Sequence, residues 1–390
     1  MSTPTLDRCR AAQQGLLWEL TAPTNSRPLK PPGVPLAPLR RAMRRAERPQ
    51  IVVNDSARVP LTDLAAVLAD LWEHARGRPI LIATGTHSED LARMRDRLGG
   101  LPCELHQADD EDAHGPCGPG HLDKRLLEAD LVLAFGSVEP HYFAGWAGAH
   151  KTATIGVASR ATISHNHRHA LSSDACPLAL KGNPVFEDLE RLLEGLESTR
   201  RLLAVDHVLD GQGRALAVGV GTWRGALQRA LRVAERRFVA LRQEPVQVLV
   251  VHPHGPLGES LYQADKALKN HEAILARGGD IIVWSEELSH VGPDRFLTLL
   301  RAAPDHDAAR AEVERAGYVL GDHKAVRLRA LEARGARIHV AAPRLDPDAL
   351  AGTGIAQHAS LEEALAAVRA PSGAGLLVED AGVQVSALAT

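Results

Sequence analysis

Residues 80–87 read Ile-Leu-Ile-Ala-Thr-Gly-Thr-His, a short apolar run that ends in a glycine turn and a histidine. Such a run, bounded by a turn, indicates a buried strand. Residues 50–55, Gln-Ile-Val-Val-Asn-Asp, show the same pattern earlier in the chain. A helix is expected after each strand, the first with Leu64, Leu68 and Leu71 on one face and the second over residues 89–98. This strand–helix–strand–helix order predicts a parallel sheet.

The second half of the chain repeats this alternation. We predict strands at residues 246–251, 281–284 and 337–342, and helices at 261–277 and 295–302. Between the two series, residues 202–220 alternate around Asp-Gly-Gln-Gly at 210–213, which is typical of a hairpin. A length of 390 residues exceeds one average domain. We therefore predict two α/β domains with mainly parallel sheets, residues 49–243 and 244–390, after an N-terminal arm of residues 1–48.

The composition favours a small-molecule partner. Lys and Arg total 45 against 48 Asp and Glu, and this balance gives no reason to expect a nucleic-acid or anionic-membrane partner. Four scattered cysteines fit neither a disulfide framework nor a C-x-x-C metal site. No apolar run approaches the roughly 20 residues of a membrane-spanning helix. We expect a soluble, cytoplasmic protein.

Residues 139–167 hold most of the chemistry of the sequence. They follow an apolar run at 131–135 and contain four histidines and one lysine, namely His141, His150, His165, His167 and Lys151. Polar residues also end the two earlier strands: Asp55 and Arg58 after the first, His87 after the second. Because the carboxyl ends of parallel strands lie on one edge, where ligands bind in such sheets, we expect His141, His87 and Asp55 to converge there.

The pattern alone leaves the roles of these residues open. His165 and His167 would share a face on a strand, as metal ligands often do, but no second His or Cys cluster completes a zinc site. Lys151 is either an ordinary basic residue or a desolvated nucleophile. Arg58 offers a planar fork for a carboxylate or phosphate, or else forms a salt bridge with Asp55.

Several motifs, in this order and spacing, resemble the lactate racemase family. They are Asp55-Ser56-Ala57-Arg58-Val59-Pro60, Ala83-Thr84-Gly85-Thr86-His87, Glu139-Pro140-His141-Tyr142-Phe143-Ala144-Gly145, Gly156-Val157-Ala158-Ser159-Arg160, Asn166-His167, Gly182-Asn183-Pro184 and Tyr262-Gln263-Ala264-Asp265-Lys266. The resemblance covers most of residues 49–385. It implies a two-domain α/β isomerase that binds a nickel-pincer nucleotide, with the active site in the cleft between its domains.

The resemblance also assigns roles by position. Lys151 would tether the cofactor through a thioamide, His167 would be the nickel ligand, His87 and His141 would be the acid–base pair, Arg58 and Lys266 would hold the substrate carboxylate with Gln263 nearby, and Asp55 would help to position the cofactor. The implied reaction is racemisation or epimerisation at C2 of a 2-hydroxy acid by reversible hydride transfer, through a 2-keto acid. The implied partners are that substrate and the cofactor's biosynthesis proteins.

The chain departs from the family beside the tether. Ala149 and His150 stand where the family commonly has glycine and arginine, Thr152 follows the lysine, and Ile155 replaces a usual proline. A pocket for a larger substituent, lined by His150, Tyr142, Trp146 and His254, is one expectation from these changes. Two other function classes are compatible with the fold: a nicotinamide-dependent dehydrogenase, against which the missing G-x-G-x-x-G counts, and a non-catalytic nucleotide-binding homologue.

Overall fold

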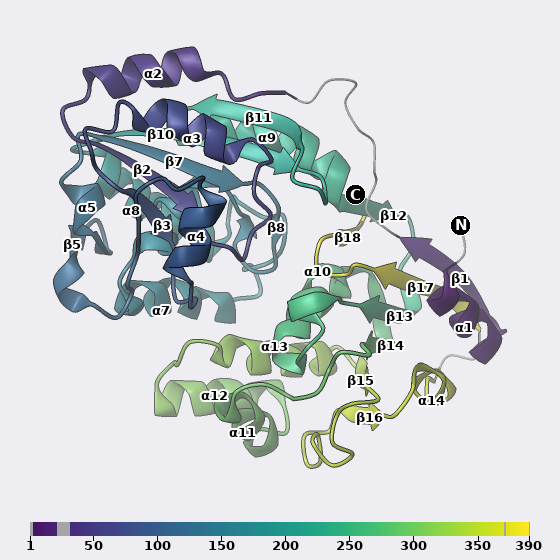
Figure 1. Cartoon of the computed structure of the whole chain (residues 1–390). Coiled ribbons are helices and arrows are strands. Elements are labelled where there is room, and N and C mark those ends of the chain that lie inside the picture. Colours follow the sequence, from purple (N-terminus) through teal and green to yellow (C-terminus); the bar gives the residue numbers. More distant parts are fainter. Residues whose placement is uncertain (1–2, 22–31, 370–371, 390) are drawn as a thin grey trace. The chain divides into compact units, whose positions relative to one another are not determined.

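The computed structural model describes residues 3–21, 32–369 and 372–389. The chain forms two compact units. The inserted unit comprises Asn25–Arg237, and the terminal unit comprises Met1–Thr24 together with Phe238–Thr390. Each unit is an α/β structure built on one six-stranded sheet, as the sequence predicts (Figure 1).

The sheet of the inserted unit has the strand order β11-β10-β7-β2-β3-β4. All neighbours are parallel except β10 and β11, which form the predicted hairpin. The strands are β2 Pro49–Asn54, β3 Ile80–Ala83, β4 Cys103–Leu105, β7 Leu131–Ser137, β10 Arg201–Leu209 and β11 Ala215–Gly221. The helices are α2 Leu36–Arg45, α3 Leu64–Trp72, α4 Leu91–Arg97, α5 Lys124–Leu127, α6 Ala149–Thr152, α7 Arg160–Arg168, α8 Pro184–Glu197 and α9 Trp223–Phe238.

Helices cover both faces of this sheet because both faces of its central strands are apolar. Ile51 of β2 and Leu133 of β7 are buried with Leu68 of α3 and Met94 of α4. The intervening residues point to the other face, where α6 packs on β2 and β7. Burying an aliphatic side chain of this size contributes about 1.5–3 kcal/mol. The continuous apolar runs, without alternation, are the signature of such doubly covered strands.

The sheet of the terminal unit is entirely parallel, with the order β1-β17-β13-β14-β15-β16. Its strands are β1 Leu16–Thr21, β13 Val246–His252, β14 Leu275–Trp284, β15 Arg337–Ala341, β16 Ala356–His358 and β17 Gly373–Glu379. Its helices are α1 Pro4–Ala12, α10 Leu261–His271, α11 Asp294–Ala302, α12 His306–Ala316, α13 Asp322–Ala333 and α14 Leu361–Ala366. A separate two-stranded parallel sheet pairs β12 Val239–Arg242, which precedes β13 in the chain, with β18 Val385–Leu388, which follows β17.

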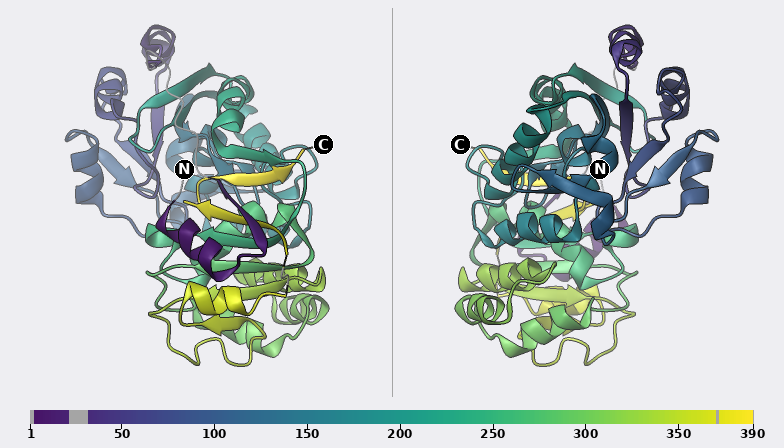
Figure 2. Two further views of the ribbon diagram at one scale, coloured as in Figure 1. Left: turned by 90° about the vertical axis from the view of Figure 1, so that its right-hand side faces the viewer. Right: turned by 90° about the vertical axis from the view of Figure 1, so that its left-hand side faces the viewer.

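The N-terminal segment differs from the expected arm. Residues Leu16–Thr21 form an edge strand that pairs with β17, and α1 packs on the same sheet through Leu6 and Cys9 (Figure 2). The pattern Leu-Leu-Trp-Glu-Leu-Thr is short enough to be overlooked, and its partner lies near the other end of the chain. Part of the proline-rich piece, at residues 28–31, lies outside the described residues.

Two further boundaries differ in detail. The division between the units falls at Arg237 and Phe238, slightly before the expected start of the second domain at residue 244. The helix expected over residues 261–277 ends at His271, because Leu275 already begins β14. Within the described residues, no helix has the length and apolar character needed to cross a membrane.

Candidate active site

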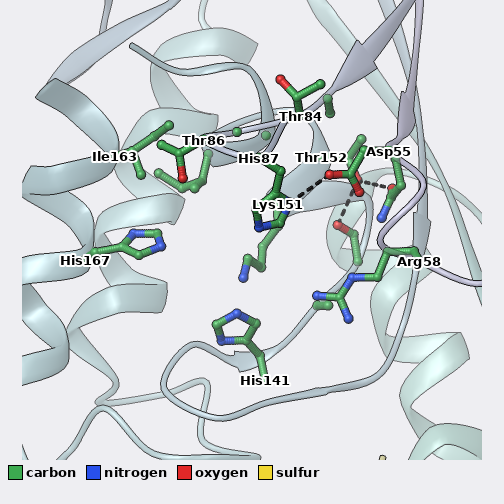
Figure 3. A pocket seen from close by; sticks show the side chains of 17 residues that line it. Asp55, Arg58, Thr84, Thr86, His87, His141, Lys151, Thr152, Ile163 and His167 are labelled. Atoms are coloured by element: carbon green, nitrogen blue, oxygen red, sulfur yellow. Dashed lines mark hydrogen bonds and ion pairs between the residues drawn. The ribbon is translucent and has the colours of Figure 1, made fainter. Parts of the chain in front are cut away.

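The polar strand ends of the inserted unit surround one pocket. Strands β7, β2 and β3 are neighbours in the sheet, so the residues that follow them lie on one edge. The pocket is lined by Asp55, Arg58, His87, His141, Lys151 and His167, among others (Figure 3). The expected convergence of His87, His141 and Asp55 is therefore observed, and α6 and α7 add the lysine and a further histidine.

His87 is held by Asp55. The Nδ1 atom of His87 lies 2.8 Å from Oδ2 of Asp55, whose carboxylate is buried, while the His87 side chain is 65% exposed. The other carboxylate oxygen, Oδ1, accepts a bond from the backbone nitrogen of Ala57. Because the carboxylate is an acceptor, the neutral imidazole carries its proton on Nδ1 and presents Nε2 as an acceptor. This is the arrangement of a general base oriented by a carboxylate.

His141 is held in the other neutral tautomer. Its Nδ1 atom accepts a hydrogen bond of 3.1 Å from the backbone nitrogen of Ala144. A neutral imidazole that accepts at Nδ1 carries its proton on Nε2. The ring lies among Tyr142 and Phe143, with ring centroids 5.1 and 4.6 Å away. In their neutral forms the two pocket histidines therefore present different groups at Nε2, His87 a hydrogen-bond acceptor and His141 a hydrogen-bond donor.

Lys151 is placed by a short helix packed tightly on the sheet. Helix α6 approaches β7 so closely that a Cβ atom on Gly136 would clash with the backbone nitrogen of Ala149. That nitrogen donates a 2.7 Å hydrogen bond to the buried carboxylate of Asp206 on β10. Thr152 donates a 2.8 Å bond to Asn54, which ends β2. With both of its ends fixed, α6 directs Lys151 into the pocket (Figure 3).

His167 lies on α7, which begins at the capping residue Ser159. Burial lowers the pKa of His167 to about 3, and the charge of Lys151 acts in the same direction. The imidazole is therefore neutral at physiological pH, the form that binds metals. Within the described residues, its Nδ1 atom makes no well-formed hydrogen bond.

The expectation that His165 and His167 share a face is wrong. It assumed a strand, whereas the residues lie on helix α7, where positions two apart point to different sides. The side chain of His165 is 61% exposed and lies 3.9 Å from Asp188. The sequence around them, Ala-Thr-Ile-Ser-His-Asn-His, has no long helical period, so a strand was equally compatible.

Arg58 pairs with Glu139 instead of Asp55. Its Nη1 atom lies 2.9 Å from Oε2 of Glu139, and Oε1 of that carboxylate accepts a 2.8 Å bond from Ser137. The guanidinium has five N–H donors, so this contact leaves capacity for a further anion. The other two expected carboxylate-binding residues, Gln263 and Lys266, lie on α10 of the terminal unit. Their role stays a prediction.

Part of the chain matches a known domain family. Residues 29–177 match the lactate racemase N-terminal domain. The chain is similar to the lactate racemases. It is 26% identical over 241 residues to the lactate racemase of Thermoanaerobacterium thermosaccharolyticum, and 27% over 242 residues to that of Lactiplantibacillus plantarum. Each alignment covers 58% of this chain and 56% of the relative, so the match spans little more than half of each protein.

Solved structures confirm the lactate racemase fold. The lactate racemase apoprotein of Thermoanaerobacterium thermosaccharolyticum matches with a TM-score of 0.78 and 20% identity, over 97% of this chain and 92% of that one. A Thermotoga maritima protein matches with a TM-score of 0.65 and 14% identity, over 90% and 97%. The resemblance drawn from the sequence motifs is therefore confirmed, by the match to the family's N-terminal domain and by the shared fold.

Of the four positions that depart from the family pattern, Thr152 and Ile155 line the pocket, whereas Ala149 and His150 do not. His150 is fully buried between Phe186 and Trp223, with ring centroids 5.6 and 6.1 Å away. Burial lowers its pKa to about 3, so it is a neutral core residue. Tyr142 and Trp146 are also buried. None of these three is among the lining residues of the pocket, contrary to expectation. The fourth, His254, belongs to the terminal unit.

Two residues that hold groups of the pocket in place were not assigned a role from the sequence. Asp206, fully buried, binds the backbone of Ala149, and Glu139 binds Arg58. Burial raises the pKa of Asp206 to about 7, although the Ala149 hydrogen bond opposes this. A signal for Asp206 exists: residues 204–208 read Ala-Val-Asp-His-Val, and two polar residues within an apolar strand need a local reason.

Proposed function

We propose that this chain is a racemase or epimerase that inverts C2 of a 2-hydroxy acid, with a nickel-pincer nucleotide as its cofactor. The observation that carries the proposal is the set of side chains around one pocket, namely two histidines held in different tautomers, a lysine and a partly buried neutral histidine. The likeness to lactate racemases supports the same reaction class.

The residues present fit this cofactor. A neutral imidazole is a suitable ligand for a nickel ion, and His167 offers one whose Nδ1 lacks a well-formed hydrogen bond in the described part of the chain. Lys151 lines the same pocket and has the amine needed for a thioamide tether. When bound, the nickel-pincer nucleotide supplies an acceptor and donor of hydride. That chemistry is needed because the α-hydrogen of a 2-hydroxy acid is far too weakly acidic for an imidazole to remove.

The chain's own groups would move the hydroxyl proton. Nε2 of His87, with its Nδ1 bound to Asp55, accepts the proton from the hydroxyl of one enantiomer. His141 is the second proposed acid–base group: as an imidazolium it gives its Nε2 proton to the carbonyl oxygen of the flat 2-keto acid, and both rings exchange protons with solvent before the next turnover. In that form Nδ1 no longer accepts the hydrogen bond from Ala144. In the reverse direction the two residues exchange roles. Each enantiomer presents its hydroxyl differently, so two such groups are required.

A fixed cation must hold the substrate carboxylate, so that the keto acid can present its opposite face without leaving the site. Arg58 supplies one in the pocket, where Glu139 holds its guanidinium from one side. Lys266 and Gln263 of the terminal unit are proposed as the further carboxylate ligands, on the basis of their match to the family motif. The substrate class is therefore a small 2-hydroxy acid, and the proteins that make the cofactor are the proposed partners.

The deciding experiment is intact-protein mass spectrometry with nickel analysis. The protein is coexpressed with the cofactor's biosynthetic enzymes, as wild type, as Lys151→Ala and as Lys181→Ala, a control at an exposed lysine of the same unit. We expect a nucleotide-sized covalent adduct and nickel in the wild type and in the control, and neither in Lys151→Ala. Absence of adduct and nickel from the wild type would overturn the proposal.

The loaded protein is then tested with single enantiomers of 2-hydroxy acids in D₂O. Racemisation that leaves the C2 hydrogen unexchanged supports hydride transfer. Incorporation of solvent deuterium at C2 would instead show a proton-abstraction reaction and contradict the proposed mechanism. A dehydrogenase would instead consume NADH. The glycine fingerprint of such enzymes is missing here, since the first strand is followed by Asn54-Asp55-Ser56-Ala57-Arg58.

A further inference from the structure

The terminal unit gathers two histidines and a carboxylate at the carboxyl ends of neighbouring strands. His252 is the last residue of β13 and Glu379 the last of β17, and these two residues are paired in register. Pro253 follows and extends the chain, so that His254, two positions on, returns to the side of His252. The two imidazole ring centroids are 4.0 Å apart.

Three donor atoms converge in this cluster. Nδ1 of His252 lies 2.8 Å, and Nε2 of His254 3.5 Å, from the same carboxylate oxygen of Glu379. All three ligand atoms lie within 4.8 Å of one another. Ligands held about 2.0–2.2 Å from a tetrahedral zinc ion are about 3.4 Å apart, so these separations match such a shell after small side-chain rotations.

An ordinary histidine–carboxylate ion pair needs only one histidine at the carboxylate. Here the rings of His252 and His254 both direct a nitrogen to the same oxygen of Glu379, with ring centroids 4.0 Å apart. A cation bound to all three groups accounts for this convergence, because each group then offers a lone pair to the ion.

The surroundings also suit a cation. Thr3 donates a 3.1 Å hydrogen bond to Oε1 of Glu379 and so orients the carboxylate as an outer group does in metal sites. Oδ1 of Asp380 lies 3.9 Å from Nε2 of His254 and adds negative charge beside the cluster.

We propose that His252, His254 and Glu379 form a binding site for a divalent transition-metal ion, built from residues of the terminal unit alone. Two imidazoles and one carboxylate favour ions of the zinc, cobalt, nickel and iron(II) group over calcium or magnesium. Three protein ligands leave at least one position to water or another ligand, the pattern of an open site.

The test is titration of untagged, chelator-treated protein with Co²⁺, followed by its visible ligand-field absorption and by competition with Zn²⁺. The protein is produced without the cofactor's biosynthetic enzymes, so the pincer site contributes no nickel. We expect one equivalent of Co²⁺ in the wild type, and an affinity at least about 10–100-fold lower in His254→Ala and in Glu379→Gln. His254 is 45% exposed, so its removal leaves the core intact.

Two control variants locate the bound ion. His290→Ala removes an exposed histidine of the same unit, and His165→Ala disrupts the other His–carboxylate cluster. Full binding in both controls, with circular dichroism showing all variants folded, supports the proposal. No binding by the wild type, full binding by His254→Ala, or loss of binding in His165→Ala overturns it.

Discussion

The carboxyl edges of the two sheets carry similar residue types in different arrangements. In the inserted unit, His87, His141, Lys151 and His167 stand around a pocket. In the terminal unit, three donor atoms lie within 4.8 Å of one another. Both edges follow the rule that α/β sheets bind ligands where their strands end. The spacing of the side chains therefore determines the kind of ligand: side chains that surround a pocket suit a molecule, and side chains whose donor atoms meet suit a metal ion.

A second histidine cluster, in the inserted unit, differs from the terminal one in the groups that surround its carboxylate. His165, His169 and Asp188 also lie close enough together to hold an ion. There, however, Nη1 of Arg191 lies 3.5 Å from Oδ1 of Asp188, and Asn166 donates to the other oxygen. A guanidinium at the carboxylate opposes a metal cation. Glu379 instead has two histidines as its ion-pair partners and a threonine as its donor.

The largest expected effect is on the chemistry of the inserted unit. We predict that His87→Asn and His141→Asn each lower kcat for racemisation by about 10²–10⁴-fold, since each removes a proton-transfer group. Adduct formation and nickel content stay at wild-type levels, and so does Co²⁺ binding. His121→Asn, at an exposed histidine of the same unit, is the matched control. Full activity in either pocket variant contradicts the proton-transfer roles.

One buried aspartate in each sheet should contribute to the free energy of unfolding with an opposite dependence on pH. The pKa of Asp206 is raised to about 7 by burial, so the folded state holds its proton longer than the unfolded state and stability falls as pH rises from about 4 to 7. The slope from one such group is about 1.4 kcal/mol per pH unit. Asp206→Asn removes this term, and urea unfolding of both proteins across that range measures the difference. The contributions of the other titrating groups cancel in the difference between the wild type and the variant.

Asp280 is the matched case in the terminal unit. Burial acts to raise its pKa, but hydrogen bonds from His339 and Arg337 outweigh this and lower it. Its contribution to stability is therefore present above the unfolded-state pKa and lost as pH falls through the folded-state value. Asp280→Asn should be most destabilising at neutral pH and less so in acid. If both substitutions changed the free energy of unfolding with the same pH dependence, the predicted difference between the two aspartates would be wrong.

Metal should stabilise one unit and not the other. At a free Zn²⁺ concentration 100 times the dissociation constant, binding to the native state adds about 2.7 kcal/mol. We expect this gain in the wild type and in His167→Ala, and its loss in Glu379→Gln. Thermal unfolding measures the gain, and hydrogen exchange locates it in the terminal unit. Equal protection of the inserted unit's strands would show that the ion binds elsewhere.

The smallest expected effects come from two helix caps. Ser159 caps α7, which carries His167, and Ser260 caps α10, which carries Gln263 and Lys266. Each serine accepts a backbone hydrogen bond, so replacement by alanine should cost about 1 kcal/mol. Hydrogen exchange should show faster exchange in the helix that lost its cap and little change in the other. Equal changes in both helices would contradict local effects.

The central strands were predictable because both of their faces are buried. Residues such as Ile80–Ala83 are apolar without alternation, and this pattern identifies a strand and a parallel sheet together. The meeting of His87 with Asp55 followed from the sheet, since the strands before them are neighbours. The roles proposed for Lys151 and His167 came from the family resemblance, because geometry alone left them open.

What the sequence could not give depends on distant contacts. The strand β1 needs a partner near residue 373, and no local pattern names it. His165 and His167 suited a strand or a helix until the packing of α7 decided. Asp206 was visible as a polar residue in an apolar strand, but its bond to Ala149 requires the helix to be placed first. The convergence of His254 on Glu379 likewise joins residues far apart in the chain.

The pairing of Leu16 with Gly373 has a consequence for synthesis on the ribosome. The inserted unit leaves the exit tunnel as one continuous segment, Asn25–Arg237, and can form its sheet early. The first strand of the terminal unit, made before it, must wait for β17. Until then, the apolar residues Leu6, Cys9 and Trp18, which are buried in the finished unit, lie exposed on the nascent chain. Slow translation or a bound chaperone at that stage should therefore affect the terminal unit first.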